Sequence, residues 1–212
     1  MKIERFFAEL VGTATLLIAV VGSSFMASQL TSDSAIALLV NAAVTAAALA
    51  VLIKVFSPIS GAHFNPAVSL AAVVCKRMQL KDLVGYVLAQ ISGAVIGVAL
   101  ANAMFSNSFL VLSKVERSGS GQVIGELIAT LGLVLLALSA DSKSAWKIIP
   151  LWIFGAYFFT VSTSFANPAV TVSRSLTGAP AGIAPSSVTV FVLVQLITAV
   201  IAASIMVRKV RT

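Results

Sequence analysis

The feature that most constrains the fold of this chain is a series of six long apolar runs. Each is close to the ~20 residues that a helix needs to cross the ~30 Å hydrocarbon core of a bilayer. The runs cover residues 6–27, 35–56, 82–104, 121–140, 147–163 and 187–207. Two further apolar pieces, 66–75 and 168–177, are too short to cross. We therefore expect an all-α membrane protein with six transmembrane helices, whose first partner is the lipid bilayer.

The composition supports this class and excludes several functions. Of the 212 residues, 59% are hydrophobic and 10% are charged, whereas an ordinary soluble domain has roughly 25% charged residues. The net charge of +7 comes from basic residues scattered in short loops, which argues against nucleic acid as a partner. The sequence shows no cluster of His, Cys, Asp and Glu and no nucleophile–base constellation, so we expect no metal, no cofactor and no catalytic residue.

The basic residues predict the orientation in the membrane. If the N-terminus is cytoplasmic and the sides alternate, eleven basic residues lie inside and three outside. The three outside are Lys114, Arg117 and Arg174. Because short cytoplasmic loops carry an excess of Lys and Arg, both termini are expected to be cytoplasmic, in a plasma (inner) membrane.

The two halves of the chain repeat each other. The matching segments are AELVGTATLL (8–17) with GELIATLGLV (125–134), and AQISGAVIGVA (89–99) with VQLITAVIAAS (194–204). Three spans in each half place the second half upside down relative to the first. We therefore predict one domain, residues 1–212, built from inverted repeats 1–105 and 118–212, with a pathway near the bilayer midplane.

A polar break recurs in both halves. SGAHFNPAVSL spans residues 60–70 and TSFANPAVTVSR spans residues 163–174. Each contains Asn-Pro-Ala: Asn65-Pro66-Ala67 and Asn167-Pro168-Ala169. Asn can cap a helix and Pro suits its first turn. Each break therefore starts a half-helix of about ten residues, or ~15 Å, and two of these meeting end to end would span the bilayer.

Four motifs together resemble the aquaporin, or major intrinsic protein, family. They are AE-x-x-GT in the first span, SGAH-x-NPAV, Y-x-x-AQ-x-x-GA at residues 86–94, and the second NPA. The resemblance covers essentially the whole chain. It implies six transmembrane helices with two re-entrant half-helices, and a passive channel for water and small neutral solutes. It also implies a homotetramer with one pore per subunit.

The resemblance assigns roles to individual residues. Asn65 and Asn167 match the side chains that donate hydrogen bonds to permeating molecules, and the half-helix dipoles would oppose cations and protons. The outer selectivity filter would be formed by four positions, for one of which Phe165 is a competing choice. Counted along the chain from Asn65 and Asn167, these positions are Thr45, Gly155, Ser164 (or Phe165) and Val170.

The predicted filter has no large side chain and no charge, because Val170 stands where nearly all family members have Arg. We therefore expect it to be wide and to admit glycerol-like molecules. A Val here resembles a bacterial branch associated with neutral metalloid or arsenical species. The runner-up function is a coupled secondary transporter, which also uses inverted repeats and broken helices. The breaks favour the channel because they carry neutral Asn rather than ion-binding acids.

Four further residues have two interpretations each. Arg174 lies one turn beyond Val170, so its guanidinium could face the outer pore or extend to lipid headgroups. Glu9 and Glu126 lie inside spans, where a proton relay is possible but a structural role on the irregular backbone is favoured. His63 is more readily a hydrogen-bonded structural residue than a pH gate.

Overall fold

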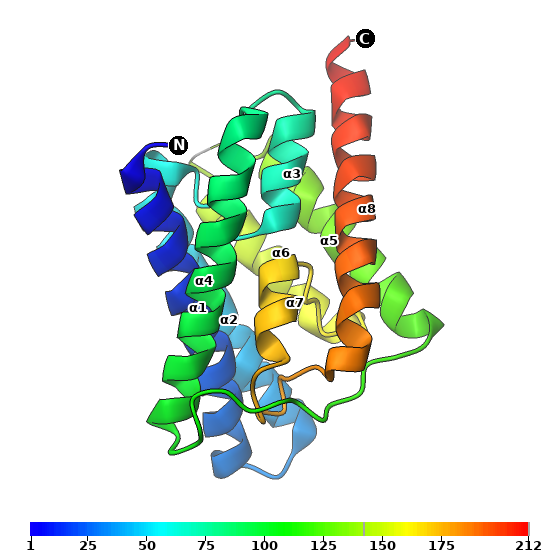
Figure 1. The fold of residues 1–212 in the computed structure, drawn as a ribbon. Helices are drawn as coiled ribbons and strands as arrows, with labels where there is room; N and C mark the ends of the chain where they lie inside the picture. Colours follow the sequence, from blue (N-terminus) through cyan, green and yellow to red (C-terminus); the bar gives the residue numbers. More distant parts are fainter. Residues whose placement is uncertain (142, 212) are drawn as a thin grey trace.

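The apolar runs fold as helices. The computed structural model describes residues 1–141 and 143–211, with side chains up to residue 208. Across this described part the chain forms α-helices and loops, with no strand (Figure 1). The helices are α1 (Ile3–Leu30), α2 (Ser34–Ser60), α3 (Pro66–Val74), α4 (Leu80–Met104), α5 (Ser120–Ser139), α6 (Ala145–Phe159), α7 (Pro168–Arg174) and α8 (Pro185–Arg211).

Helix ends follow local chemistry, as α2 illustrates. The Asp33 carboxylate caps its start by accepting hydrogen bonds from the backbone N–H of Ala35 at 2.8 Å and of Ile36 at 3.0 Å. The helix ends at Gly61, whose φ of +91° is a left-handed conformation that favours glycine. Residues within a few positions of each end therefore set the length of this helix.

Five helices, α1, α2, α4, α5 and α8, are long and apolar enough to cross a membrane, as judged within the described residues. The sixth, α6, has 15 residues and is shorter than the predicted run 147–163. It ends at Phe159 because the following backbone is not helical: Thr163, Ser164 and Ala166 have φ between +47° and +57°. The apolar run continues into an irregular segment rather than into helix.

The half-helix α7 is also shorter than predicted. It has seven residues, whereas the sequence suggested a helical piece over 168–177. Its continuation is prevented by the loop between α4 and α5, residues 105–119. In that loop, Val111 N donates to the Leu176 carbonyl at 3.1 Å and Ser113 N donates to the Ser175 carbonyl at 2.9 Å. The chain after Arg174 is thus paired with the loop.

Close helix packing in the first half depends on small residues. A Cβ on Gly93 would lie 2.2 Å from the Leu10 carbonyl oxygen, and one on Gly97 would lie 2.3 Å from the Ala14 carbonyl oxygen. These two positions on α4 let its backbone touch that of α1, the packing that small residues permit between membrane helices. In the second half, α5 packs against both α6 and α8.

The half-helices α3 and α7 lie one above the other in the middle of the bundle (Figure 1). Both pack against α4 and α8, and their N-terminal ends contact each other. Each of the two breaks in the sequence therefore leads to the same central point, which the inverted repeat predicts.

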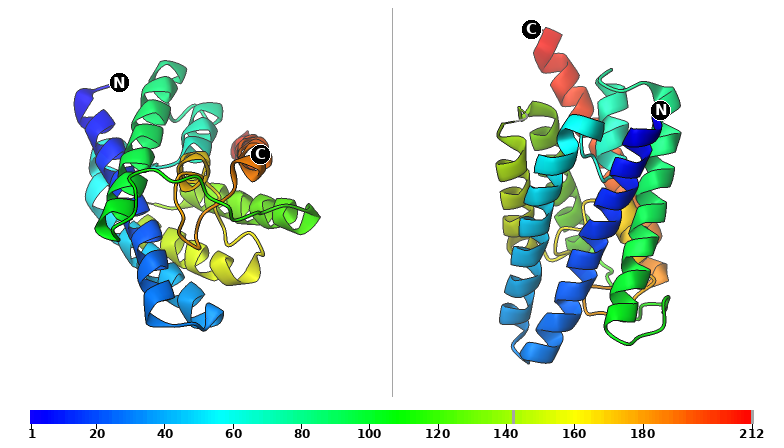
Figure 2. Two further views of the ribbon diagram at one scale, coloured as in Figure 1. Left: turned by 60° about the horizontal axis from the view of Figure 1, so that its bottom comes forward. Right: turned by 90° about the vertical axis from the view of Figure 1, so that its left-hand side faces the viewer.

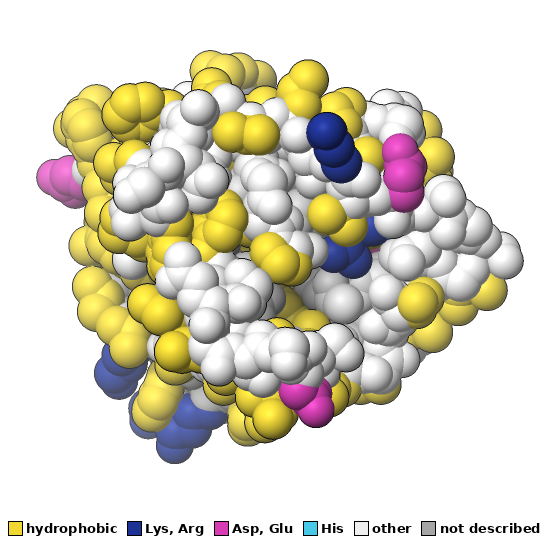
Figure 3. Space-filling view, turned by 90° about the horizontal axis from the view of Figure 1, so that it is seen from below, with side chains coloured by type: hydrophobic (Ala, Val, Ile, Leu, Met, Phe, Trp, Pro, Cys, Tyr) yellow, Lys and Arg dark blue, Asp and Glu magenta, His cyan; other side chains and the backbone are white. Residues whose placement is uncertain are grey.

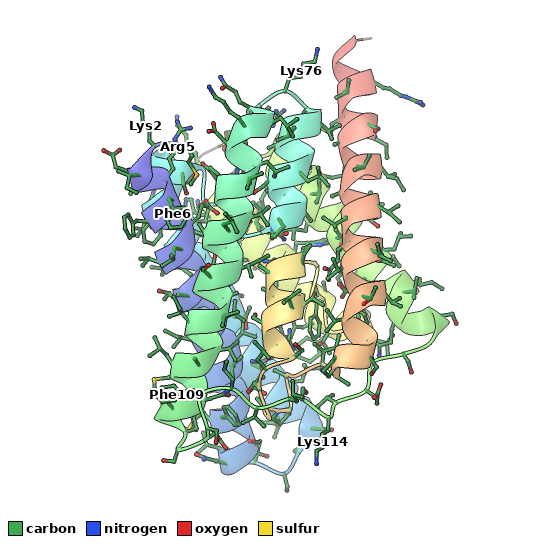
Figure 4. The ribbon with its side chains drawn as sticks, viewed as in Figure 1. Lys2, Arg5, Phe6, Lys76, Phe109 and Lys114 are labelled. Carbon is green, nitrogen blue, oxygen red and sulfur yellow. The ribbon has the colours of Figure 1, made fainter. Side chains whose placement is uncertain are left out.

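The two ends of the bundle differ. Both termini lie at one end, here called the terminus end, where Lys2, Arg5 and Lys76 also gather (Figure 4). Phe109 and Lys114 mark the opposite end, here called the loop end (Figure 4). The loop 105–119 runs across the loop end from α4 to α5 and passes the chain that follows α7 (Figure 2).

Candidate functional site

The irregular chain before α3 is held by a buried carboxylate. Glu9, which is fully buried, accepts hydrogen bonds from the backbone N–H of His63 at 2.9 Å and of Phe64 at 2.7 Å. It also accepts from the Ser60 hydroxyl at 2.6 Å and the Gln90 amide at 2.8 Å. Phe64 has a φ of +48°, so this network satisfies a strained segment inside the protein.

Glu126 repeats this arrangement before α7. It accepts from the backbone N–H of Phe165 at 2.9 Å and of Ala166 at 2.8 Å, and from the Gln195 amide at 2.5 Å. The hydrogen bonds that the structural interpretation of both acids requires are therefore present. Glu9 accepts hydrogen bonds from four donors and Glu126 from three. Each acid is therefore committed to backbone N–H groups and to a glutamine.

The two asparagines cap their own helices and bind the opposite half. Asn65 Oδ1 accepts from Ala67 N at 2.8 Å and Asn167 Oδ1 accepts from Ala169 N at 3.0 Å, with Pro66 and Pro168 in the first turns. Their amides cross over the centre. Asn65 Nδ2 donates to the Ala166 carbonyl and Asn167 Nδ2 donates to the Phe64 carbonyl, both at 2.8 Å. The amide planes are thus fixed from both sides.

A cavity of about 270 Å³ passes these asparagines. At the terminus end it is lined by Arg77, which donates to the Leu138 carbonyl, and by Asp141. The Ser144 hydroxyl and backbone N–H groups hold the pKa of the Asp141 carboxyl below its usual range. At the loop end the cavity reaches Arg174. Its lining therefore extends over both half-helices, from Arg77 and Asp141 to Arg174.

His63 lies on the cavity wall near the centre. Its Nδ1 is 3.0 Å from the Ser69 hydroxyl, and its ring packs on Tyr86 with the centroids 5.2 Å apart. These contacts fix the imidazole as a hydrogen-bonded part of the wall.

Three of the predicted filter residues line the cavity and one does not. Thr45, Ser164 and Val170 are buried lining residues, but Gly155 is absent from the lining. Tyr157, two residues further along α6, takes that place, and its hydroxyl lies 3.3 Å from that of Thr45. Counting back from Asn167 crosses a non-helical segment, where residue number does not report which residue of α6 faces the cavity.

The loop-end wall also contains a bulky ring and a charge, contrary to the expected ring without either. Phe165 and Arg174 both line the cavity, and the Arg174 guanidinium carbon lies 3.6 Å from the Phe165 ring centroid. Arg174 is 1% exposed, so its side chain does not extend to lipid headgroups or outer water. Of the two interpretations of Arg174, the geometry favours the one that faces the cavity.

Sequence reasoning missed two residues at this end. Tyr157 could have been found only from the face of α6. Arg117, in the loop 105–119, lies over the same Phe165 ring at 4.9 Å, a contact between segments that no local pattern predicts. Burial lowers the pKa of the Arg117 guanidinium, but an arginine stays protonated in proteins.

In the part of the chain that the structure describes, no group of three His, Cys, Asp or Glu residues could hold a metal ion. What the site contains is a cavity with fixed donors at its centre and the Arg174 guanidinium on its wall at the loop end. Such an arrangement can pass small molecules along a row of hydrogen-bonding groups.

Comparison with known proteins gives a consistent picture. The model of the family described as "Major intrinsic protein" matches residues 1–162. Aquaglyceroporin AqpS of Rhizobium meliloti (strain 1021) is 44% identical over 206 residues, covering 96% of this chain and 88% of that protein. Glycerol uptake facilitator protein-like 6 of Lactiplantibacillus plantarum is 26% identical over 212 residues, covering 94% and 95%.

The fold has a solved counterpart as well. The X-ray structure of the aquaglyceroporin from Plasmodium falciparum superposes with a TM-score of 0.76 at 20% identity, covering 95% of this chain and 94% of that one. At that identity the likeness shows the fold alone, and it confirms the expected aquaporin-like architecture. The family model and the 44% identical relative from Rhizobium meliloti point to the same family, and the fold is consistent with it. This chain belongs to the major intrinsic protein family.

Proposed function

We propose that this chain is a passive membrane channel for water and small uncharged solutes such as glycerol. The observation that carries the proposal is the crossed pair of asparagines on the cavity wall. Each amide nitrogen has two N–H donors, and one of them is used on the opposite carbonyl. The second is left for a molecule in the cavity, in an orientation that the first one fixes.

This geometry favours neutral molecules over ions. A water or hydroxyl oxygen that accepts from Asn65 and Asn167 replaces part of its lost hydration as it passes. The wall offers no carboxylate at this point, because Glu9 and Glu126 are occupied by backbone N–H groups. An ion would lose far more hydration than two amides can replace. Ions and protons are therefore excluded.

The solute range rests on the relatives and on Val170. Two similar proteins are described as an aquaglyceroporin and as a glycerol uptake facilitator-like protein, which supports glycerol as a permeant. Val170 in place of the family's Arg supports neutral metalloid or arsenical species as further permeants. These molecules are uncharged and carry hydroxyl groups, as glycerol does.

The proposal includes placement and assembly. Lys2, Arg5 and Lys76 at the terminus end support a cytoplasmic position for that end by the positive-inside rule, and hence a plasma (inner) membrane protein with the loop end outside. Exposed apolar side chains on the outer faces of the helices are compatible with lipid and with a homotetramer, one pore per subunit. Chemical crosslinking in membranes tests the tetramer.

The test is stopped-flow light scattering on proteoliposomes, with empty liposomes as the control. Gradients of sucrose, glycerol, urea and arsenous acid are applied in turn. We expect water flow and glycerol entry well above those of empty liposomes. Solute entry at the rate of empty liposomes, with fast water flow, would restrict the channel to water. No rise in either would contradict the proposal.

A further inference from the structure

Two guanidinium groups lie on one aromatic ring at the loop end. The Arg174 guanidinium carbon is 3.6 Å from the Phe165 ring centroid, and that of Arg117 is 4.9 Å from it. The edge of the ring is held in turn by Phe191, whose centroid is 5.3 Å away in an edge-to-face contact. Such cation–π contacts gain strength where water is excluded, and Arg174 and Phe165 are 1% and 3% exposed.

The two arginines also bind the same short turn. Arg174 Nε donates to the Ala181 carbonyl, while Arg117 Nε donates to the Gly182 carbonyl at 2.9 Å. Arg117 Nη2 reaches the Pro180 carbonyl at 3.4 Å. The turn 180–182 and the Phe165 ring therefore hold both guanidinium groups in place.

The position of this cluster matters because Arg174 and Phe165 line the cavity. The described hydrogen bonds of Arg174 use only its Nε, so its terminal N–H groups remain for molecules in the cavity. Across the cavity, the lining includes the Thr45–Tyr157 hydroxyl pair and the buried Ser164 hydroxyl, which has no partner. Seen from the loop end, Lys or Arg side chains lie near a hollow close to the middle of the face (Figure 3).

We propose that Arg174 is a specificity-determining residue of the pore, and that Arg117 is the positioning residue that fixes it through Phe165 and the turn 180–182. Resting on the proposed channel function, this inference names the solutes that the outer end selects. Compact neutral polyols and amides pass, because their oxygens accept from Arg174 while their C–H groups contact the Phe165 side of the wall. Cations are repelled and bulkier polyols are excluded.

Arg117 acts through the other arginine rather than on the solute. Its Nε and Nη2 donate to the turn 180–182, and Arg117 is absent from the cavity lining. Without it, the turn 180–182 loses two side-chain hydrogen bonds from the loop 105–119, and Phe165 loses one of its two cationic contacts. The Arg174 guanidinium would then sample more positions and narrow the pore less.

The test measures the ratio of erythritol permeability to water permeability in proteoliposomes. Arg174→Ala should raise the ratio by about fivefold, because the guanidinium that narrows the path for this bulkier polyol is removed. Arg117→Ala should raise it less, by about twofold. Lys114→Ala, which removes an exposed charge from the same loop, should leave it unchanged.

Two further variants distinguish positioning from mere stability. Arg117→Ala in the Arg174→Ala background should add nothing, because residues that act through one another are non-additive. Arg117→Lys should give a ratio between those of wild type and Arg117→Ala, because it keeps a cation on Phe165. If Arg174→Ala fails to fold, Arg174→Lys and Phe165→Leu report on the same wall, and each should raise the ratio.

Each outcome counts for or against a stated claim. An unchanged ratio in Arg174→Ala, with water flow intact, would overturn the role of Arg174. Additive effects of the two arginine substitutions would overturn the positioning role of Arg117. Wild-type liposomes that conduct no better than empty ones would instead refute the channel itself, so the two failures are distinguishable.

Discussion

The two half-helix entries are built on the same frame and differ where they face the cavity. Glu9 with Gln90 holds the first, and Glu126 with Gln195 holds the second. In both halves the glutamine amide also donates to the hydroxyl of the residue four positions after the asparagine. Gln90 donates to Ser69 at 3.0 Å, and Gln195 donates to Thr171 at 2.9 Å. The internal repeat therefore preserves the parts that satisfy irregular backbone.

The cavity-facing positions do not follow the repeat. Two residues before the asparagine, His63 in the first half corresponds to Phe165 in the second. Seven residues after it, Ala72 corresponds to Arg174, and all four line the cavity. One half offers an imidazole and a methyl group, whereas the other offers a ring and a guanidinium. The difference teaches that the scaffold is duplicated while the cavity-facing residues are not, and we propose that selection lies at the loop end.

The largest effects should come from breaking the shared frame. Glu9→Ala and Glu126→Ala each leave several buried donors without an acceptor. At about 1–3 kcal/mol for each unsatisfied group, we expect either protein to fold poorly and to lose most of its yield as a monodisperse species. Size-exclusion chromatography in detergent measures this. A well-folded Glu126→Ala protein beside an unfolded Glu9→Ala protein would contradict the equivalence of the two frames.

The next test transfers the charged wall to the other mouth. Ala72→Arg places an arginine at the position that the repeat equates with Arg174. Ala72 is buried and lines the cavity, so a long side chain there should occupy the path. We expect water permeability to fall by about tenfold, as an added obstruction and charge would do. Ala72→Ser is the matched control and should conduct normally, whereas normal conduction by Ala72→Arg would contradict the path.

Val170→Arg adds the missing family residue to the half that already has Arg174. The two side chains lie on one face of α7, a turn apart, so this end becomes narrower and more cationic. Because the path is narrower, glycerol permeability should fall about fivefold relative to water permeability, while water flow survives. Val68→Leu, the corresponding position of the first half, controls for added bulk. Equal glycerol flow in Val170→Arg and wild type would place selection elsewhere.

The smallest effect is expected when the first entry is made to resemble the second. His63→Phe removes the contact between His63 Nδ1 and the Ser69 hydroxyl, but Gln90 still donates to that hydroxyl. We expect a loss of about 1 kcal/mol in the free energy of unfolding and a modest fall in water flow. Thermal unfolding in detergent and stopped-flow swelling measure the two. Complete loss of water flow would assign His63 a role beyond the wall.

The parts that sequence predicted are those set by short-range chemistry and by the repeat. Asn65 and Asn167 cap helices because Asn-Pro does so wherever it occurs in this context, and the alignment of Glu9 with Glu126 places both acids under equivalent loops. Two carboxylates in corresponding spans, each in a half with an irregular break before a half-helix, already favoured a backbone role. Neither conclusion needed the tertiary structure.

The rest depended on geometry that residue spacing does not carry. Gly155 was chosen by counting through a segment with left-handed residues, and Tyr157 faces the cavity instead. Arg117 reaches Phe165 only because the loop 105–119 is paired with the chain after α7. Residue spacing also predicted the face of α7 on which Arg174 lies. It did not show whether the guanidinium points into the cavity, which follows only from its contact with the buried Phe165 ring.

The central claim, a passive pore, is tested most directly by glycerol entry into proteoliposomes with and without an imposed proton or sodium gradient. Because Glu9 and Glu126 are committed to backbone N–H groups, we expect neither acid to couple an ion to the solute. The account predicts entry that follows the glycerol gradient alone, at a rate that no proton or sodium gradient changes. Entry that requires either gradient, or glycerol accumulation against its own gradient, would contradict it and indicate a coupled transporter.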